Sequence, residues 1–161
     1  MSELLYFAYG SNLHPLWLKS RTPSAEIVSV ETLVGFSLSF NKHGLDDSGK
    51  CNITETSQDD HVLGAVYRFQ AEEKAVLDEA ERGYQEHSIA VGAHENVLIY
   101  IADDPVEDYS SPYSWYQDIV LAGAGLHGFP DPYLQHIRAF TAKPDPDSAR
   151  DLRHRTIVEL L

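Results

Sequence analysis

"YFAYGSNL", residues 6–13, joins a predicted strand to a predicted helix near the start of the chain. Residues 4–9 are apolar and aromatic, which is typical of a buried strand, and Gly10 ends this run. A short helix is expected over residues 15–20, where Pro15 suits the first turn. The first unit of the predicted fold is therefore a strand that runs through a small polar turn into a helix.

The Gly-Ser-Asn turn is the first candidate for a binding site. Ser11 or Asn12 is predicted to cap the helix that follows. Gly10 is predicted either to adopt a positive φ or to let a ligand approach the backbone closely. Several backbone N–H groups then point into one small space, an arrangement that binds carboxylates or phosphates. Because such turns are also common without any ligand, both interpretations stay open at this point.

The rest of the chain predicts mainly strands, followed by helices. In "VGFSLSF", the alternation of Val34, Phe36, Leu38 and Phe40 with small residues indicates a strand with one apolar face. Strands are predicted within residues 25–41, 51–57, 61–69, 88–91 and 96–102, and helices over residues 70–81, 115–129 and 130–140. We expect an α+β fold in one domain over residues 1–161, with a sheet that closes into a small barrel.

Composition and charge exclude several classes of protein. The net charge is −13, from 12 basic and 25 acidic residues, which argues against non-specific binding of nucleic acid. No stretch approaches the ~20 apolar residues that span a bilayer, and no export signal is recognisable. The single cysteine, Cys51, cannot form an internal disulfide and fits a cytoplasmic location. A homodimer is compatible with this composition, but nothing in the sequence requires one.

Acidic residues cluster in "LDEAERGYQE", residues 77–86. Asp78 and Glu81 are three positions apart and share one face of the predicted helix. A carboxylate that moves protons must be partly buried at a cleft, with its pKa raised toward neutrality. Most carboxylates on such a helix instead face solvent, and the sequence alone does not separate the two cases.

Aromatic residues and histidines are the remaining candidates. Tyr109, Tyr113, Trp115 and Tyr116 either line a small-molecule pocket or pack a long connection against the sheet. The eight histidines are scattered, and none stands four residues from another, so the sequence predicts no metal site.

Three motifs in order, "YFAYGSNL", "LDEAE" and "SPYSWYQDIVLAGAGLHGFP", resemble the γ-glutamylcyclotransferase (AIG2-like) family. The resemblance extends over residues 5–140. It implies a small mixed β-barrel flanked by helices. It also implies an enzyme that converts a small γ-glutamyl amino acid or amine into 5-oxoproline and the free amine, without a cofactor or metal.

The resemblance also assigns roles to residues. Glu81, the second glutamate of "LDEAE", takes the place of the catalytic general base and acid, with Asp78 and Glu79 as neighbours that set the local field. The implied substrate-binding residues are Tyr9, Gly10, Ser11, Asn12, Leu13, Tyr100 and Tyr116. The backbone N–H groups of the loop would hold the glutamyl end of the substrate, and the tyrosines would line the cavity.

The sequence departs from the family pattern directly after Glu81. Family members commonly continue with glycine and, about six residues later, a tyrosine. Here Arg82, Gly83 and Tyr84 follow, so the expected tyrosine is missing or has moved to Tyr84. An ion pair between Arg82 and Glu81 would lower the pKa of the glutamate. Two alternatives therefore stay open: a γ-glutamylamine cyclotransferase of a biosynthetic pathway, and a non-catalytic binding module of the same fold.

Overall fold

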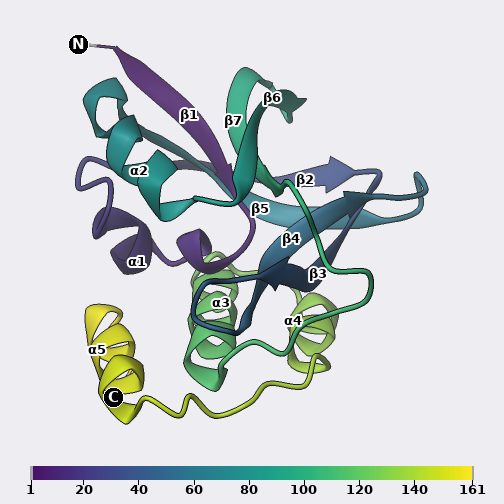
Figure 1. The fold of residues 1–161 in the computed structure, drawn as a ribbon. Helices are drawn as coiled ribbons and strands as arrows, with labels where there is room; N and C mark the ends of the chain where they lie inside the picture. Colours follow the sequence, from purple (N-terminus) through teal and green to yellow (C-terminus); the bar gives the residue numbers. More distant parts are fainter. Residues whose placement is uncertain (1, 161) are drawn as a thin grey trace.

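The computed structural model describes residues 2–160 and shows a curled mixed sheet with a short second sheet and flanking helices (Figure 1). The strands are β1 (Glu3–Ala8), β2 (Glu26–Val34), β3 (Phe36–His43), β4 (Gly49–Glu55), β5 (His61–Gln70), β6 (Tyr84–Val91) and β7 (His94–Ala102). The helices are η1 (Ser11–Leu13), α1 (Pro15–Lys19), η2 (Ala71–Glu73), α2 (Lys74–Ala80), α3 (Ser114–Leu126), α4 (Asp131–Arg138) and α5 (Ser148–Ile157). The predicted domain limits, residues 1 and 161, lie outside the described residues.

Strand β1 is the centre of the larger sheet, whose strand order is β2-β5-β1-β7-β6. It pairs antiparallel with β5, with Tyr6 opposite Tyr67, and parallel with β7, with Tyr6 opposite Leu98. Strands β3 and β4 form a separate antiparallel hairpin. Because β1 is central, the polar turn that follows Ala8 emerges from the middle of the sheet and not from its edge.

The predicted α+β fold is confirmed, but the larger sheet curls without closing, so the word barrel describes it only loosely. Its edge strands, β2 and β6, share no backbone pairing in the described part of the chain. Side chains instead connect β2 with the start of β7, since Ser29 Oγ lies 3.2 Å from His94 Nε2 and Glu31 Oε2 lies 4.0 Å from the same nitrogen. In a closed barrel, backbone hydrogen bonds would join the edge strands β2 and β6. Here the region of the β6–β7 turn contacts β2 through polar side chains instead.

Most predicted elements are present, and two details differ. The cap of α1 is His14, whose Nδ1 accepts a hydrogen bond from the Leu16 amide, and not Ser11 or Asn12. Those two residues form η1, which leaves the side chain of Asn12 free to act elsewhere. Val34 is exposed because the strand turns at Gly35, where φ is 91°, so only the residues from Phe36 onward share the apolar face.

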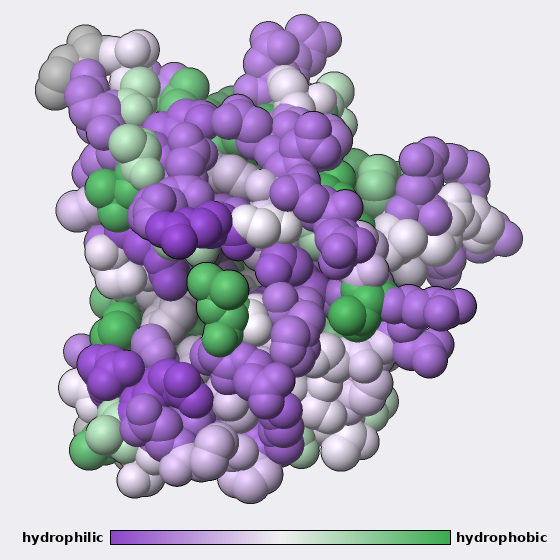
Figure 2. Space-filling view, viewed as in Figure 1, coloured by the Kyte–Doolittle hydropathy of each residue, from purple (hydrophilic) through white to green (hydrophobic). Residues whose placement is uncertain are grey.

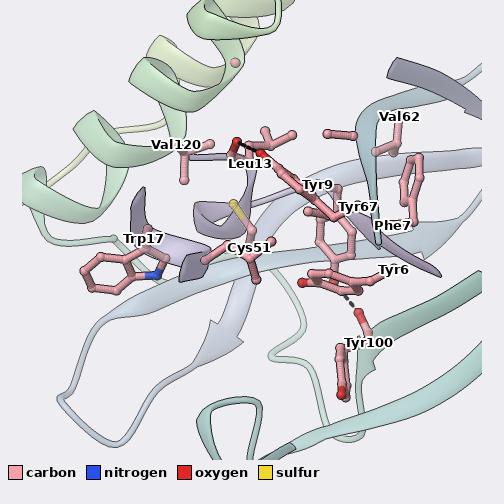
Figure 3. Packing of buried hydrophobic residues seen from close by; sticks show 14 of the residues in the cluster. Tyr6, Phe7, Tyr9, Leu13, Trp17, Cys51, Val62, Tyr67, Tyr100 and Val120 are labelled. Atoms are coloured by element: carbon pink, nitrogen blue, oxygen red, sulfur yellow. Dashed lines mark hydrogen bonds between the residues drawn. The ribbon is translucent and has the colours of Figure 1, made fainter. Parts of the chain in front are cut away.

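The core lies between the sheets and helix α3, and it fixes the polar turn from behind. Phe7 and Leu13 are fully buried, which places both ends of the turn in the apolar interior. The Tyr67 hydroxyl donates a hydrogen bond of 2.8 Å to the Leu13 carbonyl, one of the contacts drawn in Figure 3. In residues 2–160, no helix combines the length and apolar character that crossing a membrane requires.

Candidate active site

Two adjoining cavities lie where the polar turn, α2 and β4 meet. The inner cavity has a volume of about 30 Å³ and the outer cleft one of about 430 Å³. Both are lined by Ser11, Glu81, Tyr84 and Tyr116, so these residues form the junction between them. The inner cavity is completed by Tyr6, Tyr9, Gly10, Asn12, Cys51 and Tyr100. A small molecule bound at the junction would contact the predicted catalytic glutamate and the predicted binding loop together.

Glu81 is partly buried at the C-terminal end of α2. Its backbone N–H donates to the Leu77 carbonyl, which completes the last turn of the helix. The chain then reverses at Gly83, where φ is 91°. On the carboxylate side, Asn12 Nδ2 donates a hydrogen bond of 2.8 Å to Oε1. The end of the helix thus directs Glu81 toward the polar turn.

Burial raises the pKa of the Glu81 carboxyl to about 7. The nearby guanidinium of Arg21, the hydrogen bond from Asn12 and the ammonium of Lys42 act in the opposite direction but do not cancel this effect. A carboxyl group with this pKa exchanges its proton readily near neutral pH, which suits a group that acts first as a base and then as an acid.

Backbone hydrogen bonds within the polar turn involve only some of its amides. The amides of Leu13 and His14 donate to the carbonyls of Gly10 and Ser11, each at 3.1 Å. Leu13 itself lies in the core and lines neither cavity, while its carbonyl accepts hydrogen bonds from Tyr67 and from His127 Nε2 at 2.7 Å. We therefore expect the amides that precede Leu13, and not that of Leu13, to contact a ligand, while Leu13 anchors the turn in the core.

Gly10 is required by close packing and not by a positive φ. Its φ is −120°, so the first of its two predicted roles is wrong. A Cβ atom at this position would lie 2.8 Å from the Cβ and 3.3 Å from the Sγ of Cys51. Glycine thus lets β4 approach the turn, and this approach forms one wall of the inner cavity.

The predicted pocket tyrosines lie in the inner cavity and are fixed by hydrogen bonds. The Tyr9 hydroxyl donates to the Tyr100 carbonyl at 2.6 Å, as Figure 3 shows. The Tyr116 hydroxyl accepts from the Cys51 amide at 3.0 Å, and the Tyr84 hydroxyl donates to the Cys51 carbonyl at 2.6 Å. Burial raises the pKa of Tyr9, Tyr84 and Tyr116 well above the usual value, so these walls are neutral.

Sequence reasoning missed Tyr6, Cys51 and Arg21 as residues of the site. The Tyr6 hydroxyl accepts from Asn12 Nδ2 at 3.0 Å, and Arg21 Nη1 donates to Asn12 Oδ1 at 3.3 Å. The sequence did contain a hint of the position of Arg21, because this residue stands four positions after Trp17, a spacing that brings side chains together on a helix. In the structure, the Arg21 guanidinium lies over the Trp17 ring, 4.7 Å from its centroid.

The residues around the acidic motif are arranged differently from the expected pairing. Arg82 forms its ion pair with Glu79 and not with Glu81, so the concern that Arg82 lowers the pKa of Glu81 is not supported. Asp78 accepts a hydrogen bond of 2.5 Å from the Tyr100 hydroxyl and pairs with Lys74. Of the late aromatic residues, Trp115 lines the outer cleft, whereas the Tyr113 hydroxyl donates to the Asp46 carbonyl.

The surface around these elements is mainly hydrophilic. In the orientation of Figure 1, hydrophobic side chains appear as small separate spots on a polar surface (Figure 2). The polar surface agrees with the high net charge of the chain. The two cavities, and not an extended apolar patch, are thus the candidate ligand-binding sites of this region.

Comparisons with known proteins identify a family model and several similar chains. Residues 6–118 match the family model described as gamma-glutamyl cyclotransferase, AIG2-like. The gamma-glutamylcyclotransferase of Mus musculus is 31% identical over 150 residues, which cover 84% of this chain and 77% of the mouse protein. The Homo sapiens protein of the same name is 31% identical over 147 residues, covering 85% and 78% of the two chains. A solved structure titled gamma-glutamyl cyclotransferase shares the fold, with a TM-score of 0.82, 24% identity and coverage of 99% and 100%.

Proposed function

The chain belongs to the gamma-glutamyl cyclotransferase, AIG2-like family of enzymes, and we propose that it converts a small γ-glutamyl amino acid or amine into 5-oxoproline and the free amine. The names of the similar proteins support this reaction class. The substrate and the product are our inference from the chemistry of the site.

The reaction needs one group that moves a proton twice. The α-amine of the substrate gives a proton to the Glu81 carboxylate and attacks its own γ-carbonyl carbon. A new C–N bond closes the five-membered ring, and the carbonyl electron pair moves to oxygen. When the intermediate collapses, the original C–N bond breaks and Glu81 returns the proton to the leaving nitrogen. No oxidant, reductant or second substrate is consumed, so atoms and electrons balance.

The observation that carries this proposal is the position of Glu81 at the junction of the two cavities, hydrogen-bonded to Asn12 of the polar turn. With a pKa near 7, its carboxylate is basic enough to take a proton and acidic enough to return it. We assign the scissile amide to this junction, with the glutamyl part toward the inner cavity and the leaving group toward the outer cleft.

The polar turn would supply binding and electrostatic stabilisation. We assign the glutamyl end of the substrate to the backbone N–H groups of Gly10, Ser11 and Asn12, with Leu13 as their anchor in the core. Backbone donors held rigidly in a partly buried site stabilise developing negative charge effectively. The walls formed by Tyr9, Tyr100 and Tyr116 would keep the substrate curled, so that the amine stays close to the carbonyl carbon.

The test is to identify the product by mass spectrometry. The purified protein is given γ-glutamyl-alanine and, in parallel, its α-N-acetyl derivative, whose nitrogen cannot attack. The proposal predicts 5-oxoproline from the first compound and no reaction of the second. Release of glutamate from the first, or of N-acetylglutamate from the second, would instead identify a hydrolase and contradict the proposal.

We also propose a cytoplasmic location. Cys51 is a buried free thiol, and this supports a reducing compartment.

A further inference from the structure

The carbonyl oxygen of Leu13 is held by two side chains from distant parts of the chain. The Tyr67 hydroxyl of β5 donates to this oxygen at 2.8 Å (Figure 3), and His127 Nε2 lies 2.7 Å from it. A carbonyl oxygen can only accept, so His127 must carry a hydrogen on Nε2 and donate it here. His127 thus reaches back 114 positions, from the end of α3 to the turn after β1.

Neither His127 nor Tyr67 has a task in the proposed reaction so far. Within residues 2–160, the side chains that line the inner cavity and the outer cleft include neither of them. His127 also lies beyond residues 6–118, which match the family model. The convergence of two donors on one carbonyl behind the polar turn therefore needs its own explanation.

Helix α3 contacts the same peptide group through its backbone. A Cβ atom added at Gly123 would lie 2.6 Å from the His14 nitrogen and 2.9 Å from the Leu13 carbonyl carbon. These two atoms are the two ends of the peptide bond between Leu13 and His14. The backbone N–H of His127 donates to the Gly123 carbonyl at 3.2 Å, so the two α3 residues lie one helical turn apart. The end of α3 thus holds this peptide plane at two points.

Planar peptide groups carry this restraint toward the inner cavity. In a trans peptide the C=O and the N–H point in opposite directions. The Leu13 carbonyl points at His127, so the His14 N–H of the same plane points the other way. It donates to the Ser11 carbonyl at 3.1 Å. The Ser11 carbonyl shares its own plane with the Asn12 N–H, which therefore points away from His14.

We expect the Asn12 N–H, at the end of this relay of two peptide planes, to contact a ligand. Among residues 2–160, the amides of Ser11 and Asn12 donate to no backbone carbonyl. Both residues line the inner cavity, and the Asn12 side chain donates to Glu81. The direction of the Asn12 N–H then depends on the plane that His127 holds.

We propose that His127 is a positioning residue, whose Nε2–H fixes the peptide plane that orients the Asn12 amide toward the glutamyl end of the substrate. The inference rests on the proposed function and deepens it, because it adds a residue that touches no substrate. With both donors present, rotation of the Leu13 carbonyl would break two hydrogen bonds inside the core, which makes rotation costly. No proton is transferred through His127, since the imidazole donates the same hydrogen bond throughout the reaction.

The experiment compares His127→Leu with His127→Gln. Leucine is apolar and has no donor, whereas the glutamine amide can still donate to the Leu13 carbonyl. The readout is kcat/KM for 5-oxoproline release from γ-glutamyl-alanine, measured well below the Tm of each variant. We expect the leucine variant to lose roughly 10-fold, the usual effect of misplacing one hydrogen bond to a charged group, and the glutamine variant to regain most of it.

Two further variants complete the design. His136→Leu is the matched control, because it makes the same substitution on the neighbouring helix α4, where the ring packs edge-on against Phe140. Its kcat/KM should equal that of the wild type. Tyr67→Phe removes the other donor to the Leu13 carbonyl and retains the ring, so it should also lower kcat/KM by roughly 10-fold. This variant decides the question where His127→Leu does not fold.

Each other outcome has a definite meaning. A folded His127→Leu variant with the wild-type kcat/KM overturns the inference and leaves the proposed function intact, whatever its Tm, because the bond then contributes to stability alone. Equal losses in the leucine and glutamine variants also overturn it, since the loss would not depend on the donor. If the wild type itself releases no 5-oxoproline, the proposed function fails, and the inference fails with it.

Discussion

Asn12 and Glu81 stand 69 positions apart in the chain, and their side chains are joined by a hydrogen bond of 2.8 Å from Nδ2 to Oε1. This bond links the turn after the central strand to the end of α2. Asn12 is itself fixed on its other side by Arg21, which donates to Oδ1. The amide is therefore held with its donor toward the carboxylate, and the two predicted halves of the site act as one unit.

Replacing Asn12 by alanine should raise the pKa of Glu81, because the hydrogen bond from Asn12 favours the ionised carboxylate. We expect the pH profile of kcat/KM to shift upward and its plateau to fall by roughly 10-fold, the usual effect of losing a hydrogen bond to a charged group. Steady-state kinetics between pH 5 and pH 9 measure both changes. A profile that keeps its midpoint would show that Asn12 does not act on Glu81.

The wild-type enzyme should gain activity as the pH rises through about 7, because only ionised Glu81 takes the proton of the substrate amine. The midpoint of the pH profile of kcat/KM reports the pKa of Glu81 in the free enzyme. An ascending limb centred near 4.5, the ordinary value for glutamate, would mean that the burial of Glu81 does not control its ionisation.

Glu81 should also make the protein less stable as the pH rises. The folded-state pKa is raised, so between about 4.5 and 7 the unfolded chain has lost this proton while the folded chain keeps it. The unfolded state then binds fewer protons, and the free energy of unfolding falls through this window. Glu81→Gln removes the effect, and its Tm should exceed that of the wild type by a few degrees at pH 8 but hardly at pH 5. The same difference at both pH values would contradict the account.

Gly10→Ala tests the close approach of β4 to the turn. The new methyl group meets Cys51 at 2.8 Å, so we expect a loss of about 1–3 kcal/mol in the free energy of unfolding, typical of overpacking. Gly125→Ala is a suitable control, since Gly125 lies in α3 with no atom within 4 Å of the added carbon. That change should be neutral or stabilising, because alanine favours helix more than glycine does. Urea denaturation of both variants measures the contrast, and equal stabilities would refute the packing role of Gly10.

The parts of the fold that depend on local pattern were predictable. Alternation located the strands, as in Phe36, Leu38 and Phe40, and the run ending at Gly10 located β1. The curled sheet could not be judged in the same way, because its closure depends on whether β2 and β6 form a ladder. Instead, Ser29 of β2 contacts His94 at the start of β7, a contact between residues far apart in the chain.

The geometry of the candidate site was predictable where the residues belong to a motif, and not where it depends on packing. Glu81 and Asn12 belong to recognisable motifs, and the structure brings them together. Cys51 reaches the cavity because Gly10 admits β4, which no local signal shows. The ion-pair partner of Arg82 could not be predicted from the sequence either, because both Glu79 and Glu81 were within reach of its side chain. In the structure Arg82 pairs with Glu79, three positions earlier, as side chains at this spacing do on a helix.

The most direct test of the central claim is the rate of 5-oxoproline release by Glu81→Gln. Glutamine has nearly the same shape and still accepts the hydrogen bond from Asn12, but it cannot take the proton of the substrate amine. With γ-glutamyl-alanine as substrate, we predict a fall in kcat of roughly 10²- to 10⁴-fold with binding largely retained, the usual contribution of a general acid–base group. A folded variant that releases 5-oxoproline at the wild-type rate would contradict the role given to Glu81.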